Sequence, residues 1–150
     1  MIIEIVYGIV AFALLWVIAF VLHEFYHVLE GLRQGGTDGR IIVTKHKNIP
    51  SMNATCNNLK NYELFAYAGG ILTGITYLVL SIPFVTKMCS FLPIEIPLVT
   101  IGLVNLVYGV YEGRTLYKWN KDKYMFWHYI VYGVVIMICL IVYGVLYGIN

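Results

Sequence analysis

Charged side chains are scarce in this sequence. Asp, Glu, Lys and Arg make up 12% of the 150 residues, against about 25% in ordinary soluble domains. The formal net charge is only +2, whereas a protein that binds nucleic acid needs a pronounced basic surface for the phosphates. These two shortages argue against a soluble globular domain and against a nucleic-acid partner.

Cysteines are also few, and they are widely separated. Cys56, Cys89 and Cys139 lie in different parts of the chain, with none of the short spacings that mark a cysteine metal site or a redox pair. A disulfide-stapled fold and a thiolate metal site are therefore not expected.

Long apolar stretches dominate what remains, since 60% of the residues are hydrophobic. A helix that crosses the bilayer core needs about 20 mostly apolar residues. Four stretches satisfy this requirement, at about 2–29, 62–86, 94–112 and 125–149. We therefore expect an all-α polytopic membrane protein with about four transmembrane helices, forming one membrane-embedded domain over residues 1–150 in a lipid bilayer.

The connection between the first two spans is the largest polar segment. Its turn-rich stretch 34–39 is followed by Arg40-Ile41-Ile42-Val43-Thr44, and a run of β-branched residues after a turn predicts a strand. We expect a short β element in this first connection.

Basic residues are distributed unevenly among the connections, and this asymmetry predicts the topology. The first connection holds Arg33, Arg40, Lys45, Lys47 and Lys60, and the third holds Arg114, Lys118, Lys121 and Lys123. Connections rich in Lys and Arg stay in the cytoplasm. We therefore expect the first and third connections to be cytoplasmic and both chain termini to lie outside.

A His-Glu-x-x-His box occupies the end of the first predicted span, as His23-Glu24-Phe25-Tyr26-His27. Residues four apart share one face of a helix, so His23 and His27 can bind one zinc ion (Zn²⁺) while Glu24 acts as a general base on an activated water. Ionisable residues within a span are costly and therefore point to function. The box indicates a metal site on the cytoplasmic side of the membrane.

A catalytic zinc site needs a third protein ligand. Glu112 closes the third predicted span, which runs towards the cytoplasm, so its carboxylate should reach the depth of the two histidines. Glu63, at the start of the second span, is the alternative ligand. Glu30 follows His27 by three residues, on the same helical face, and could instead hold a ligand in place or contact substrate.

Three motifs in this order resemble the site-2 protease family of intramembrane zinc metallopeptidases, in a minimal form. They are the box at 23–27, the small-residue run Ala68-Gly69-Gly70 in the second span, and a stretch from Asn105 to Glu112-Gly113 in the third. The resemblance implies zinc bound by His23, His27 and Glu112, with Glu24 as catalytic base. Glu112 stands where the family has an Asp ligand.

The box and the resemblance together predict hydrolysis of peptide bonds in a transmembrane or membrane-associated protein substrate. Asn105, on the same helical face as Glu112, is a candidate for oxyanion stabilisation or for a bond between helices. A non-catalytic membrane metal-binding protein, for transport or sensing, and an inactive pseudoprotease are the alternatives. The oligomeric state, the substrate and the host membrane stay open.

Overall fold

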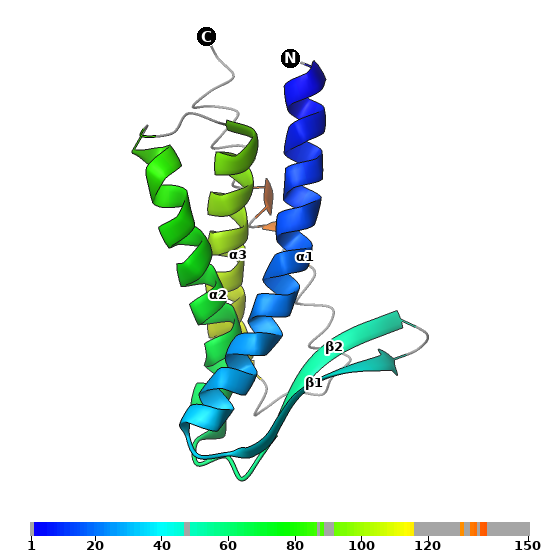
Figure 1. Cartoon of the computed structure of the whole chain (residues 1–150), viewed down its shortest axis with the longest axis vertical. Helices are drawn as coiled ribbons and strands as arrows, with labels where there is room; N and C mark the ends of the chain where they lie inside the picture. Colours follow the sequence, from blue (N-terminus) through cyan, green and yellow to red (C-terminus); the bar gives the residue numbers. More distant parts are fainter. Residues whose placement is uncertain are drawn as a thin grey trace.

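The part of the chain that the structure describes forms three long helices and one β-hairpin (Figure 1). A computed structural model describes residues 2–46, 49–86, 88 and 92–115, and beyond these only 130, 133, 134, 136 and 137. The elements run α1 (Ile2–Arg33), β1 (Thr37–His46), β2 (Ile49–Asn57), α2 (Tyr62–Val85) and α3 (Leu92–Thr115). The helices stand side by side, and the hairpin projects beside the end of α1.

Three helices of the described chain are long and apolar enough to cross a membrane, over Val6–Arg33, Tyr62–Val85 and Ile94–Arg114. The prediction of helices that could span a membrane is confirmed for three of the four, and the first three predicted spans agree closely with α1, α2 and α3. The fourth predicted span, 125–149, lies almost entirely outside the described residues.

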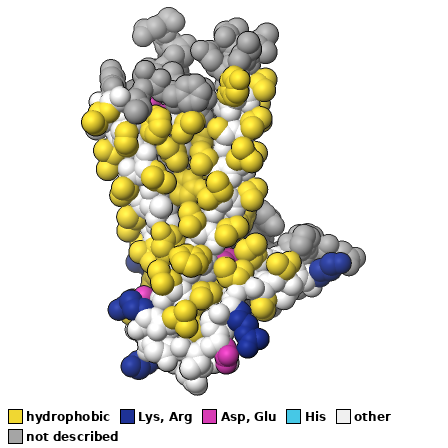
Figure 2. Space-filling model, viewed as in Figure 1, with side chains coloured by type: hydrophobic (Ala, Val, Ile, Leu, Met, Phe, Trp, Pro, Cys, Tyr) yellow, Lys and Arg dark blue, Asp and Glu magenta, His cyan; other side chains and the backbone are white. Residues whose placement is uncertain are grey.

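Hydrophobic side chains cover the visible face of the helices, and basic side chains gather at the end where α1 stops and α2 begins (Figure 2). Most of α1 lies on the outside of the bundle, with exposed side chains such as Leu14, Val17 and Phe20. An apolar outer surface of this kind suits a lipid environment, because lipid tails replace the water that would oppose it.

Two adjacent glycines end α1 sharply. Gly35 has a positive φ of 83°, its N–H donates to the Leu32 carbonyl, and the Gly36 N–H donates to the Gly31 carbonyl. This pair of bonds is a Schellman motif, in which a left-handed glycine satisfies the last helical carbonyls. Gln34 is therefore the C-cap residue of α1, a position that becomes important below.

The polar connection contains two strands, where the sequence predicted only one short element at 40–44. β1 and β2 pair antiparallel, with Ile41 opposite Ala54 and Val43 opposite Met52. The second strand was missed because Ile49–Asn57 contains proline, serine and two asparagines, which have low β propensity. An extra residue in β1 near Asp38, which has φ 56°, bulges the ladder.

Helices α2 and α3 pack with almost no space between their backbones. A Cβ atom added at Gly70 would collide with the backbone of Gly109, and one added at Gly109 would collide with Gly70. Small residues allow this approach, which supplies van der Waals contact where no hydrophobic effect drives helices together. The α1 helix packs on this pair through a cluster of Ala19, Tyr77, Leu98 and Ile101.

Candidate metal centre

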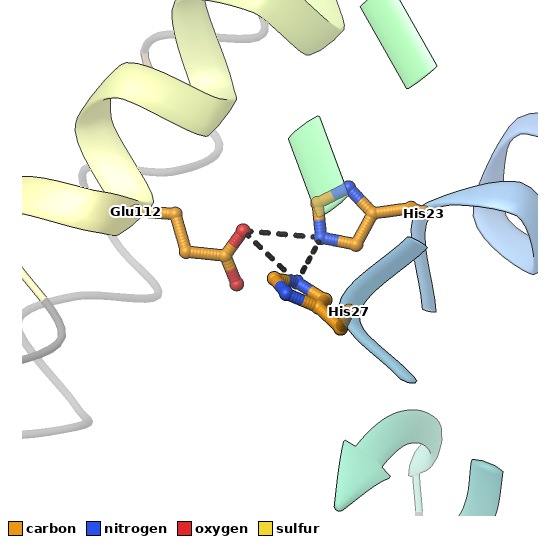
Figure 3. Close-up of side chains that lie close together, drawn as sticks. All are labelled: His23, His27 and Glu112. Carbon is orange, nitrogen blue, oxygen red and sulfur yellow. Dashed lines mark hydrogen bonds and ion pairs between the residues drawn. The ribbon is translucent and has the colours of Figure 1, made fainter. Parts of the chain in front are cut away.

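Two helices bring three metal-ligating side chains to one buried point (Figure 3). His23 and His27 project from α1, and Glu112 projects towards them from the last turn of α3. Their exposed fractions are 6%, 4% and 9%. The group could hold a metal ion, and the structure thus brings together the three residues that the sequence named as ligands.

The spacing of the ligand atoms suits a small tetrahedral ion. Oε2 of Glu112 lies 3.0 Å from Nε2 of His23 and 3.5 Å from Nε2 of His27, and the two Nε2 atoms are 3.1 Å apart. Ligands at 2.0–2.1 Å from a zinc ion at the corners of a tetrahedron lie about 3.3–3.4 Å apart. The three atoms therefore need only small shifts to bind one ion.

The protonation of His27 explains why these atoms call for a cation. Nδ1 of His27 lies 2.5 Å from the Phe65 carbonyl, so Nδ1 must carry a proton and, in the neutral ring, Nε2 is left with a lone pair. This lone pair faces Nε2 of His23, 3.1 Å away, and the Glu112 carboxylate, 3.5 Å away. The described residues also give the buried Oε2 of Glu112 no well-aligned hydrogen bond, although His23 Nε2 is close to it. A cation would satisfy both atoms.

A glycine makes room for the second histidine. A Cβ atom added at Gly69 would collide with Nε2 of His27 and lie within 2.7 Å of other atoms of its ring. On the other side of the site, the ring of Tyr108 lies 5.3 Å from the ring of His23 between centroids. The two imidazoles are thus confined by α2 and α3 as well as by their own helix.

Glu24 lies beside the ligand group, and the hairpin holds its carboxylate. The N–H of Ala54 donates a hydrogen bond of 2.6 Å to Oε2 of Glu24. Because this N–H points at α1, it does not bond to β1. The edge of β2 that faces the site is therefore its outer edge, the one on the side away from β1. A backbone donor to a carboxylate makes a strong, charge-assisted hydrogen bond, which fixes the orientation of Glu24.

The remaining candidates lie outside the ligand group. Glu63 is exposed in the first turn of α2. Glu30 is buried but bonds to Arg33 and Gln34. Asn105 is 5% exposed, and its side-chain N–H₂ donates to the Ile101 carbonyl of its own helix, 2.9 Å away.

Sequence reasoning missed the contacts that Phe65, Ala54 and Tyr108 make at this site, and it named Gly69 in the small-residue motif without relating it to His27. Two of them carried a detectable signal: Tyr108 precedes Glu112 by four residues and so shares its face, and the Gly69-Gly70 pair is unusual in a span. The contributions of Phe65 and Ala54 come from backbone atoms, which leave no mark in the side-chain pattern.

Comparisons with protein-family models, with curated proteins and with solved structures found no match to this chain.

The ligand group makes a direct prediction about metal content. Glu112→Gln should lose most of its bound metal, because the amide keeps the shape of the side chain but not the negative charge. Glu63→Gln is the matched control and should keep one metal ion per chain. Elemental analysis of detergent-purified protein measures the metal content of both variants. It also identifies the metal, which matters because two imidazoles and a carboxylate suit iron(II) as well as zinc. Equal metal contents in the two variants would contradict this ligand set.

The contact between Gly69 and His27 makes a second prediction. Gly69→Ala should weaken zinc binding by at least tenfold, because the new methyl group occupies the space of the His27 ring. The matched control is Gly74→Ala in the same helix, where the added Cβ would crowd Leu106 of α3 and not a ligand. Competition with a chromophoric zinc chelator compares the two affinities. If the control weakens binding equally, helix packing and not the imidazole explains the effect.

Proposed function

We propose that the protein is an intramembrane zinc metallopeptidase, similar in its motif order to the site-2 protease family. The observation that carries the proposal is the convergence of His23, His27 and Glu112 at tetrahedral spacing inside a bundle of membrane-length helices. The position of Glu24 next to this group favours hydrolysis over simple metal storage.

A zinc ion held by these ligands would lower the pKa of water towards about 7 and polarise a substrate carbonyl. The protein's own contribution to the reaction is proton transfer. Glu24 accepts a proton from water as the water oxygen forms a bond to the carbonyl carbon. It then returns the proton to the amide nitrogen as the C–N bond breaks, and the products are a carboxylic acid and an amine.

The hairpin supports a protein substrate in an extended conformation. The outer edge of β2 faces Glu24 and pairs with no other strand among the described residues. Such an edge beside a site can bind a peptide by adding a strand. The predicted strand at 40–44 lies in β1, which pairs with the opposite edge of β2. We propose that a transmembrane or membrane-associated protein presents its scissile bond along β2.

The site lies towards the basic end of the bundle, which we propose is the cytoplasmic side. Phe65 lies in the first turn of α2 and Glu112 in the last turn of α3, close to Arg33, Lys60 and Arg114. The excess of basic residues at this end follows the positive-inside rule. In this orientation the N-terminus is outside, and the proposed cleavage occurs near the cytoplasmic surface of the membrane.

The base is the residue that separates a peptidase from a metal transporter or sensor. Glu24→Gln should keep its zinc and lose peptide cleavage by at least a hundredfold, because general acid–base catalysis contributes about 10²–10⁴ in rate. Cleavage can be followed by mass spectrometry with single-span peptides reconstituted in vesicles. Glu63→Gln serves as the control and should cleave normally.

Two other results would each reject the peptidase proposal. A wild-type protein that binds zinc and transports it across the vesicle membrane, without cleaving any peptide, would be a transporter. A wild-type protein that holds zinc and shows neither activity would be a sensor or pseudoprotease.

The orientation can be tested with a natural sequence feature. Asn53-Ala54-Thr55 is a glycosylation acceptor pattern in the hairpin, and in the proposed orientation it stays in the cytoplasm. Synthesis in the presence of microsomes should leave it unmodified, whereas an acceptor added before Ile2 should receive a glycan. A glycan on Asn53 would invert the proposed topology.

A further inference from the structure

A buried polar stripe runs along α1 beyond the metal ligands. His23, His27, Glu30 and Gln34 are spaced by four, three and four residues, so they share one helical face. All four are 9% exposed or less. The proposed function uses only the first two, and burying Glu30 and Gln34 needs another explanation because buried polar groups are costly unless paired.

Gln34 links the end of α1 to the start of α2. Its Nε2 donates to Oε1 of Glu30 at 2.9 Å, and its Oε1 accepts from the backbone N–H of Asn61 at 2.7 Å. Arg33 holds the same Glu30 carboxylate with two bonds of 2.7 and 2.8 Å. Gln34 thus uses its donor and its acceptor at once, one towards each helix.

Asn61 extends this chain of hydrogen bonds into α2. It is the N-cap residue, and its side-chain oxygen accepts from the Leu64 N–H at 3.1 Å. Its carbonyl accepts from the Phe65 N–H at 3.3 Å. The Phe65 carbonyl then accepts from Nδ1 of His27. A single turn of α2 is therefore tied to α1 at both of its ends, by Gln34 and by His27.

We propose that Gln34 is a positioning residue for the metal centre. By fixing the first turn of α2, it places the Phe65 carbonyl where it keeps the proton of His27 on Nδ1 and the lone pair of Nε2 on the side of Glu112. Groups that orient a metal-ligating histidine in this way typically change metal affinity about 10–100-fold when they are removed. The inference rests on the metal centre of the proposed function, but not on peptide cleavage.

Two measurements test the proposal without any activity assay. In metal-free protein labelled with ¹⁵N-histidine, His27 should be protonated on Nδ1 in the wild type and should become a mixture of tautomers in Gln34→Met, which keeps the volume but loses both bonds. The zinc affinity of Gln34→Met should fall about 10–100-fold. Asn58→Gly is the control, because glycine tolerates the positive φ of 56° at this position and the change removes an exposed bond to Thr37 in the same connection.

A swap variant distinguishes positioning from a general loss of folding. Gln34→Glu alone places two carboxylates together and should disturb His27 as strongly as Gln34→Met. Combined with Glu30→Gln, it reverses the bond between the two side chains: the amide at residue 30 donates to the carboxylate at residue 34, which still accepts from the Asn61 N–H. This double variant should recover the tautomer and most of the zinc affinity.

The results separate this proposal from the peptidase proposal. If the tautomer and the zinc affinity of Gln34→Met equal those of the wild type, or if the swap fails to rescue them, Gln34 is not a positioning residue. A wild-type protein that binds zinc without cleaving peptides would reject the peptidase and leave the role of Gln34 intact.

Discussion

Two imidazoles and a carboxylate that face one another inside an apolar bundle are costly to bury, and a cation bound between them would offset that cost. The desolvation cost of such a group is high, because lipid offers none of the hydrogen bonds that water would. His23, His27 and Glu112 are in this position, and the rest of the described fold serves to bring them together. The up-down-up path of α1, α2 and α3 is what returns the end of α3 to the depth of the box in α1.

Small residues set the distances on which this convergence depends. The close contact of Gly70 with Gly109 brings α3 against α2 one turn before Glu112, and Gly69 on the neighbouring face of α2 leaves space for His27. A larger residue at either place would separate the helices by more than the few tenths of an ångström that a zinc site tolerates. The glycines of α2 therefore act on metal geometry as well as on helix packing.

Sequence patterns predicted the parts of the structure that depend on hydropathy and helical periodicity. The three described spans follow from apolar length, and the placement of Glu112 opposite the box follows from alternating span direction alone. The patterns missed β2, because its residues have weak β propensity and gain their conformation by pairing with β1. They also missed the contacts of Phe65 and Ala54, because a backbone carbonyl or N–H is present at every position and only the tertiary fold selects one.

The hairpin changes how the proposed catalytic base, Glu24, should be understood. Glu24 lies in a long and rigid helix next to the ligands, yet the partner that fixes its carboxylate is the Ala54 N–H of β2. The hairpin lies outside the helical bundle and contacts α1 through both strands. The candidate ligands are thus held by the packing of three helices, whereas the proposed base is held partly by the hairpin. If the protein is the peptidase proposed above, a peptide bound along that strand would act on Glu24 before it acts on the proposed metal ligands, and would align the proposed base as it binds.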